Sequence, residues 1–197
     1  MDKKYRKISV ITWLIIIGLW FLSTNLGWIS VNKLPKPQRV IMALFDIVKN
    51  GYNDISFWKH FGISFYRLLL AVILAILTAI PLGLLSGYFP KFRAVLSSLI
   101  NFYRPLPPLA YYTILIIWLG IDESSKIMLL FLASFAPIFI SASSAVGKVN
   151  EEYILSAKTF GANNEQIFKT VIIPATMPDI FVGIRTAVGV SYTTLVS

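Results

Sequence analysis

Residues Leu68–Phe89 read LLLAVILAILTAIPLGLLSGYF, and none of these side chains carries a charge. An uncharged apolar run longer than about 18 residues has the length that a helix needs to cross a lipid bilayer. The stretch therefore predicts a membrane-spanning helix. Pro81 lies inside it, and membrane helices tolerate such a proline because neighbouring groups satisfy the freed carbonyl.

The composition of the whole chain agrees with a membrane protein. Of 197 residues, 56% are hydrophobic and 14% are charged, whereas ordinary soluble domains are about 25% charged. The 18 Lys and Arg against 9 Asp and Glu give a net charge of +9. In so apolar a chain this excess indicates basic cytoplasmic loops rather than nucleic-acid binding. Because there is no cysteine, disulfides, thiolate metal sites and cysteine nucleophiles are excluded.

An apolar run over Ile8–Ile29 follows a basic start at the N-terminus. A cleaved signal peptide has a similar beginning. This run is about 22 residues long, however, and the sequence Thr24-Asn25-Leu26-Gly27-Trp28 is a poor cleavage site. We therefore predict a permanent N-terminal transmembrane helix within residues 1–30.

Residues 31–59 form a more polar connector, which we expect on the extracellular side. Apolar residues recur in it at helical spacing, at Val40, Ile41, Leu44, Phe45, Ile47 and Val48. This pattern predicts a short amphipathic helix at the membrane surface. The only histidine, His60, follows beside Trp58 and Phe61, and we interpret it as an interfacial residue rather than a metal ligand.

Small residues follow one another at a spacing of four within the second span, at Ala79, Gly83 and Gly87. Such a stripe lets two helix backbones approach closely. It predicts helix packing inside the chain, with a dimer face as the alternative.

A third apolar segment, Leu96–Leu119, is interrupted by Tyr103-Arg104-Pro105-Leu106-Pro107-Pro108. Three prolines in four positions cannot continue a regular helix, and irregular backbone at membrane depth is tolerated only against protein or a water-filled cavity. A charge at that depth is a functional candidate by default. The alternative is that Arg104 lies at the interface and reaches lipid phosphate. Our candidate pathway residues are Arg104, Pro105, Pro107 and Pro108.

Two further spans complete the predicted set of five. The fourth covers Ile127–Val146, after a short polar loop, and the fifth runs from Ile180 to the end of the chain. About 18 residues remain for the fifth span, or about 27 Å of helix, which barely crosses a hydrocarbon core of about 30 Å.

Lysine and arginine near the ends of spans predict which side of the membrane each loop faces. With the N-terminus in the cytoplasm, the cytoplasmic segments 1–7, 88–93 and 147–185 hold ten basic residues and the outer segments hold six. The bias favours a multi-pass cell-membrane protein with a cytoplasmic N-terminus. The ten are Lys3, Lys4, Arg6, Lys7, Lys91, Arg93, Lys148, Lys158, Lys169 and Arg185, and the six are Lys33, Lys36, Arg39, Lys49, Lys59 and Lys126.

The long polar segment between the fourth and fifth spans carries the most specific pattern. It reads Leu155-Ser156-Ala157-Lys158-Thr159-Phe160-Gly161-Ala162, followed by Val171-Ile172-Ile173-Pro174. We predict a helix over Tyr153–Phe160 that Gly161 ends in a left-handed conformation. Asn163 or Asn164 then caps a second helix, which Pro174 ends. A helix–Gly–helix elbow facing the cytoplasm suits docking on another protein, and an ordinary solvated loop is the alternative.

This segment resembles the coupling loop of ABC importer permeases, in which Glu-Ala-Ala is followed by three residues, Gly, nine residues and Ile-x-Leu-Pro. Ser156 and Ala157 stand at the two alanine positions, Gly161 at the glycine, and Leu155 departs from the glutamate. Other stretches look like the taurine, alkanesulfonate and nitrate branch of these permeases. They are Tyr103–Ala110, Ile117–Ile121, Glu123–Ile127 and Phe135–Pro137.

The resemblance implies an all-α integral membrane protein, a type I ABC importer permease bundle with about five transmembrane helices here and six in the complete protein. It implies a permease core over residues 60–197, with the coupling loop at 150–174 and the C-terminal part missing. A truncated, inactive permease is therefore the alternative to a working subunit. The residues that it assigns to the ATPase-coupling loop are Leu155, Ser156, Ala157, Gly161, Ala162 and Pro174.

The implied function is the translocation pathway for a small organic or inorganic anion, with taurine or an alkanesulfonate favoured. Arg104 and Arg185 are compatible with an anion, although Arg185 also fits the cytoplasmic start of the fifth span. The implied partners are separate ABC ATPase subunits, an extracellular substrate-binding protein and a second permease copy. The chain has no G-x-x-x-x-G-K-[ST] phosphate loop, and we expect no cofactor, metal or catalytic residue. A membrane enzyme is disfavoured because the only adjacent acid pairs lack a partner for metal or nucleophile chemistry.

Overall fold

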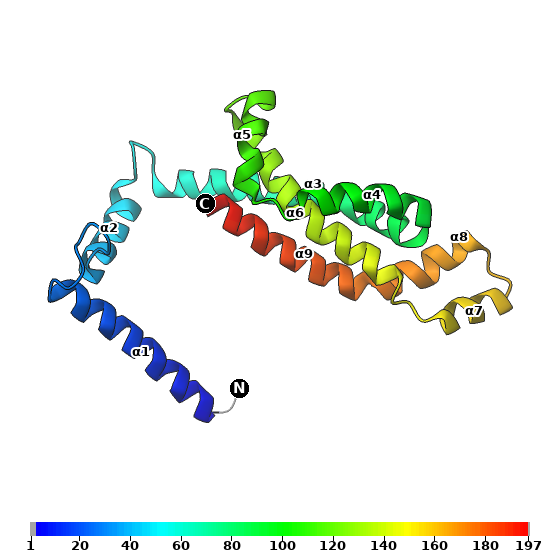
Figure 1. The fold of residues 1–197 in the computed structure, drawn as a ribbon, viewed down its shortest axis with the longest axis horizontal. Helices are drawn as coiled ribbons and strands as arrows, with labels where there is room; N and C mark the ends of the chain where they lie inside the picture. The colour runs from blue at the N-terminus through cyan, green and yellow to red at the C-terminus, as the bar shows by residue number, and fades with distance from the viewer. Residues whose placement is uncertain (1–2, 197) are drawn as a thin grey trace. The chain divides into compact units, whose positions relative to one another are not determined.

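The computed structural model describes residues 3–196, with side chains from Tyr5 onward, so Met1, Asp2 and Ser197 of the predicted first and fifth spans lie outside it. The described residues are predominantly helical, which confirms the predicted all-α fold (Figure 1). Four of their helices are long and apolar enough to cross a membrane: Tyr5–Asn25, Phe57–Tyr88, Glu123–Val146 and Asn164–Val196. The chain divides into two compact units, Met1–Gly62 and Ile63–Ser197.

The first unit contains helices α1 (Lys3–Asn25) and α2 (Pro37–Asn50). The helix predicted around Val40–Val48 is present as α2, and it starts at Pro37 because proline is well suited to the first turn of a helix. The indole Nε1 of Trp20 donates a hydrogen bond of 3.1 Å to the carbonyl of Pro35. This bond ties the end of α1 to the connector.

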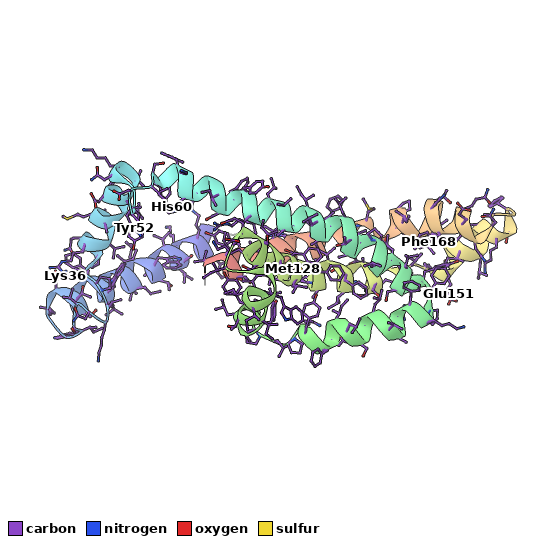
Figure 2. The ribbon with its side chains drawn as sticks, turned by 90° about the horizontal axis from the view of Figure 1, so that it is seen from above. Lys36, Tyr52, His60, Met128, Glu151 and Phe168 are labelled. Carbon is purple, nitrogen blue, oxygen red and sulfur yellow. The ribbon has the colours of Figure 1, made fainter. Side chains whose placement is uncertain are left out.

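A tight turn follows α2. Tyr52 and Ile55 exchange backbone hydrogen bonds of 2.9 and 3.1 Å, and both residues between them have positive φ. His60 Nε2 lies 3.2 Å from the carbonyl oxygen of Tyr52, and both residues are labelled in Figure 2. The histidine therefore fastens this turn to the helix that follows.

The second unit is a helical bundle built from most of α3 (Phe57–Tyr88) with α4 (Pro90–Tyr103), α5 (Pro108–Leu119), α6 (Glu123–Val146) and α9 (Ile173–Val196). Helices α3, α4, α6 and α9 run side by side, and α5 is turned out of their direction (Figure 1). Small and aliphatic residues form the core, which is typical of membrane helices that pack closely. The buried cluster contains Ala75, Ala79, Ile100, Ala136, Ile138, Phe139 and Ala187.

The predicted stripe of small residues lies where α3 meets α6. A Cβ added to Gly83 would lie 2.7 Å from the Ala142 Cβ, and a Cβ added to Gly87 would lie 2.6 Å from the Val146 Cβ. Ala79 on the same stripe is fully buried. The contact is inside the chain, as expected for the packing interpretation rather than for a dimer face.

The two ends of the bundle differ. Near the start of α6, the guanidinium of Arg67 binds the Glu123 carboxylate with both Nε and Nη2, and the Nη2–Oε1 distance is 2.6 Å. At the opposite end of α3, the rings of Tyr88 and Phe168 lie 5.2 Å apart. The segments that follow α3 and α6 therefore meet at one end of the bundle.

Several helices extend beyond their predicted limits. α3 begins at Phe57 rather than Leu68, because the Ser56 hydroxyl accepts a hydrogen bond from the Lys59 N–H and starts the helix early. α6 begins at Glu123, inside the stretch predicted as a polar loop. We predicted the spans from runs of uncharged residues. Such runs mark the apolar middle of a membrane helix, whereas its ends can contain charged residues.

The third apolar segment is two helices rather than one span. The predicted break is present between α4 and α5, and Pro108 occupies the first turn of α5. α4 itself begins at Pro90, since a proline in the first turn of a helix needs no N–H partner. Each of the two helices is too short to cross a bilayer alone.

Candidate functional site

The segment after α6 begins with a well-capped helix. The side chain of Asn150 accepts a hydrogen bond of 3.0 Å from the N–H of Glu152, which starts α7 (Glu151–Thr159). The predicted helix Tyr153–Phe160 is thus present but shifted by one or two residues. Ser156 and Ala157 lie in its second half, and Ser156 accepts the backbone N–H of Phe160 at 3.2 Å.

Gly161 has the left-handed backbone that the sequence predicts, with φ of +81°. Its N–H donates to Lys158 at 2.9 Å, and the N–H of Ala162 donates to Ala157 at 3.0 Å. These bonds satisfy the last carbonyls of α7. A glycine serves here because it has no Cβ to strain in this conformation.

The second helix begins with a reciprocal cap. Asn163 Oδ1 accepts the N–H of Gln166, and the Gln166 side chain accepts the N–H of Asn163, each at 2.9 Å. The first helix segment here is α8 (Asn164–Ile167). The two caps fix the angle between α7 and α8, so the segment is an ordered elbow rather than a loose loop.

The prediction that Pro174 ends this helix is wrong. α8 passes through a π-helical turn, η1 (Phe168–Ile172), directly into α9, which contains both Pro174 and Pro178. In the π turn the N–H of Ile173 donates five residues back, to Phe168. The π turn has already changed the hydrogen-bond pattern at this point. Pro174 can therefore follow it, because its missing N–H removes no regular α-helical hydrogen bond.

The elbow has one face against the bundle and one face free of it. Ile167 and Ile172 are buried, and the ring of Phe168 packs edge-on against Tyr88. On the other side Tyr153 and Leu155 are exposed, and Phe160 is 91% exposed. A large aromatic side chain that nothing in its own chain covers, next to a rigid turn, is a suitable contact for another protein.

The break between α4 and α5 is exposed from Arg104 to Pro107 and half-buried at Tyr103 and Pro108. α4 rises about 21 Å over its 14 residues, so Arg104 lies about that far from the start of the helix. The hydroxyl of Tyr103 donates to the Leu132 carbonyl of α6 at 3.4 Å. The Pro107 carbonyl accepts the N–H of Ala110 at 2.8 Å, which turns the chain into α5.

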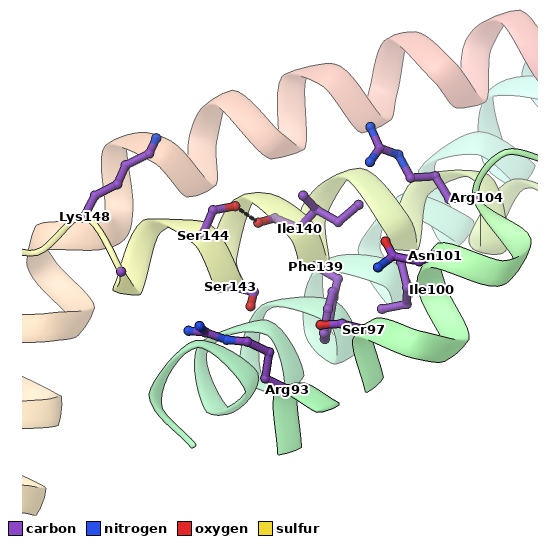
Figure 3. A pocket seen from close by; sticks show the side chains of 11 residues that line it. Arg93, Ser97, Ile100, Asn101, Arg104, Phe139, Ile140, Ser143, Ser144 and Lys148 are labelled. Carbon is purple, nitrogen blue, oxygen red and sulfur yellow. Dashed lines mark hydrogen bonds between the residues drawn. The ribbon is translucent and has the colours of Figure 1, made fainter. Parts of the chain in front are cut away.

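Arg104 lines two cavities. One has a volume of about 510 Å³ and lies between α4, α6 and the start of the elbow segment; we call it the loop-side cavity (Figure 3). The other, of about 380 Å³, lies between the α4–α5 break, α6 and α9; we call it the middle cavity. Both volumes fall in the range of about 300–1,000 Å³ that is typical of small-molecule sites.

Polar and cationic side chains face the loop-side cavity. They are Arg93, Ser97, Asn101, Arg104, Ser143, Ser144 and Lys148. Figure 3 shows that they come from α4, from α6 and from the residue positions just after each helix. The sequence reasoning found only Arg104, yet a signal was available: Arg93, Ser97, Asn101 and Arg104 recur every three or four residues, which places them on one face of α4.

Only one of the three predicted pathway prolines lines a cavity together with Arg104. Pro108 lines the middle cavity with Arg104, whereas Pro105 and Pro107 shape the connection between α4 and α5 without lining it. Arg185 lies about halfway along α9, which places it away from the cytoplasmic start of the predicted fifth span. It lines a third, open cavity of about 560 Å³, whose lining residues all belong to α9; we call it the α9 cavity.

Apolar helices of membrane-crossing length, with a capped elbow at one end and polar cavities between them, define a multi-pass membrane protein that serves transport. Residues 79–197 match the family described as the binding-protein-dependent transport system inner membrane component. The chain belongs to this family of ABC transporter permeases.

Named relatives cover almost the whole chain. The taurine transport system permease protein TauC of Escherichia coli is 39% identical over 191 residues, which are 96% of this chain and 70% of that protein. The nitrate import permease protein NrtB of Leptolyngbya laminosa is 24% identical over 195 residues, 96% of this chain and 68% of that protein.

Proposed function

We propose that this chain is the membrane permease subunit of an ABC importer and forms a translocation pathway for a small organic or inorganic anion. The observation that carries this proposal is the capped elbow formed by α7, Gly161 and α8 at one end of an apolar bundle. The similarity to the taurine permease TauC over 96% of the chain supports it. Taurine or a related alkanesulfonate is the favoured substrate.

The proposed partner of the elbow is an ABC ATPase subunit. Phe160 and Leu155 form the exposed apolar side of the elbow, and they would enter a groove on the ATPase. Closure of the ATPase around ATP would then push the elbow and, through α8 and η1, move α9. An elbow continuous with a spanning helix is a rigid lever, so a movement at the ATPase would change the bundle at a distance.

The remaining partners follow from the class of transporter. An extracellular binding protein would deliver the substrate, and a second copy of this chain would complete the pathway. The connector of residues 31–59 would face the outside, with α2 at the membrane surface as its amphipathic pattern predicts.

The proposed orientation places the elbow and the N-terminus in the cytoplasm. The contact of Tyr88 with Phe168 supports this, because it brings the basic turn after α3 to the same end as the elbow. Lys148 and Asp179 pair at 3.0 Å at that end as well. Arg185 lies about halfway along α9, so the proposed orientation counts the other nine basic residues on the cytoplasmic side.

The docking proposal can be tested by co-purification with the partner ABC ATPase expressed together with this permease. We expect Phe160→Asp to abolish recovery of the ATPase while leaving the amount of permease in the membrane unchanged. Ile121→Asp is the matched control, because Ile121 is 76% exposed but lies in the turn between α5 and α6 at the opposite end of the bundle. Equal recovery with both variants would exclude the elbow as the docking site.

A further inference from the structure

The loop-side, middle and α9 cavities form one continuous surface. The loop-side and middle cavities share Arg104 and Ile140 as lining residues. The middle and α9 cavities share Thr186 and Val190. The three cavities therefore follow one another from the elbow end of the bundle to the middle of α9.

The charge of this surface is entirely positive. Arg93, Arg104, Lys148 and Arg185 line it, and none of the described lining residues is Asp or Glu. Two of the four cations already have partners in the chain. Lys148 binds the Asp179 carboxylate, and Arg93 donates to the carbonyls of Ser86 and Gly87 at 3.2 and 2.7 Å.

Arg104 and Arg185 are the two cations of this surface whose guanidinium groups bind no acceptor among residues 3–196. Both lie well away from the elbow end of the bundle, between the ends of the long apolar helices. Arg104 is about 21 Å from the start of α4, and Arg185 is about 9 Å beyond Asp179 along α9. An unpaired charge at such a position is expensive and is retained where it meets a substrate or ion.

Neutral donors accompany Arg104. The hydroxyl of Ser97 and the side-chain amide of Asn101 face the loop-side cavity from the preceding turns of α4. Neither side chain makes a hydrogen bond within the described part of the chain. A tetrahedral oxoanion has three or more acceptor oxygens, so a guanidinium that binds two of them leaves the others for such donors.

The middle cavity between the two arginines is mainly apolar. Leu106, Leu132, Pro137 and Val190 line it together with the rings of Tyr103 and Tyr111. This lining suits the carbon chain of an organic anion better than an inorganic ion. An inorganic ion would lose hydrogen bonds to water here, and the apolar lining could not replace them.

We infer that Arg104 and Arg185 are two oxoanion-binding residues, one on each side of the apolar middle cavity, which hold the sulfonate group of a short alkanesulfonate in succession. This inference rests on the proposed import function and specifies which residues recognise the substrate. The phosphate of an anionic lipid has the same chemistry as a sulfonate, so the test separates a transported solute from a bound lipid.

The test uses the complete transporter, with its ATPase and binding protein, in proteoliposomes, and measures both taurine uptake and ATP hydrolysis. We expect Arg104→Gln and Arg185→Gln each to lower uptake about tenfold or more, the effect of losing one charge-assisted hydrogen bond. ATP hydrolysis stimulated by the liganded binding protein should stay within about twofold of the wild type. Arg104→Lys and Arg185→Lys should restore part of the uptake, because lysine keeps the charge but cannot bind two oxygens with a planar fork.

Arg39→Gln is the matched control, because Arg39 is an arginine of α2 in the other unit. The wild type and variants are compared in phosphatidylcholine vesicles with and without phosphatidylglycerol. A substrate site predicts the same loss in both lipids. A lipid site predicts that wild-type uptake requires phosphatidylglycerol and that the glutamine variants no longer respond to it, and this result would overturn the inference.

Two further outcomes would overturn it. One is wild-type uptake by either glutamine variant. The other is a parallel loss of uptake and ATP hydrolysis that lysine does not restore, which would make the arginines structural. Absence of taurine uptake by the wild-type transporter, with stimulated ATP hydrolysis intact, would instead contradict the proposed substrate.

Discussion

Gly161 shows how one residue can determine whether the elbow forms. Its φ of +81° and its hydrogen bond to Lys158 are both incompatible with proline, which fixes φ near −65° and has no N–H. We predict that Gly161→Pro abolishes uptake and the stimulation of ATP hydrolysis while membrane insertion stays normal. Gly161→Asn is the control, because asparagine tolerates the left-handed region, and normal transport by the proline variant would refute the coupling role.

A bulky residue at Gly161 tests whether a partner protein covers this position. Any side chain is strained at the φ of +81°, but a Cβ there would meet nothing within 4 Å in this chain, so the bulk of a tryptophan would be obstructed only by a partner. We predict that Gly161→Trp loses much more ATPase binding than Gly161→Ala, which carries the same backbone strain, as measured by co-purification. Retained binding would place the ATPase elsewhere.

Gly83 has the opposite surroundings. An added Cβ would lie 2.8 Å from the Phe139 carbonyl oxygen and 2.7 Å from the Ala142 Cβ, so α3 and α6 would have to separate. We predict that Gly83→Val lowers stability by about 1–3 kcal/mol, the usual cost of overpacking. Gly62→Ala in the same helix has open space around it and should cost nothing. Thermal unfolding in detergent compares the two, and equal Tm values would show that the helices are not held as described.

The roles of some site residues could be predicted from the sequence, and the roles of others could not. Gly161 and Asn163 act on their immediate neighbours, so the sequence is sufficient to predict their roles. Arg104 was found because a charge beside three prolines is conspicuous in an apolar segment. Arg93 and Asn101 on α4 share a face that their spacing indicates, but that Arg185 on α9 faces the same surface depends on tertiary packing.

At the scale of whole elements, α3 and α6 are joined by an ion pair as well as by their small residues. Arg67 binds Glu123 with two nitrogens, and the side chain of Arg67 is only 19% exposed whereas that of Glu123 is 55% exposed. Partly exposed pairs contribute about 0.2–1 kcal/mol. A double-mutant cycle with Arg67→Ala and Glu123→Ala should give a coupling free energy in that range, and additive effects would show that the pair does not connect the helices.

The helix that follows the elbow marks a limit of sequence reasoning at this scale. Proline usually ends or kinks a helix, so Pro174 was expected to stop one. The π turn from Phe168 to Ile172 absorbs the missing N–H and lets the helix continue. As a result α8, η1 and α9 form one continuous path from the proposed docking site to the cavities, which the sequence pattern did not predict.

At the scale of the whole molecule, the orientation can be tested with single cysteines, because the chain has no cysteine of its own. We predict that Lys91→Cys and Lys158→Cys are labelled by a membrane-impermeant maleimide only after the membrane is opened. Lys36→Cys and Lys126→Cys should be labelled in intact cells lacking an outer barrier. The reverse pattern would invert the proposed topology and place the elbow outside.

The most direct measurement is uptake of radiolabelled taurine into proteoliposomes that contain the complete transporter, with ATP on the elbow side and the binding protein on the other. We predict accumulation above the external concentration. It stops when the ATPase or the binding protein is omitted, and Gly161→Pro also abolishes it. Accumulation that needs neither partner, or that Gly161→Pro leaves unchanged, would contradict the proposed function.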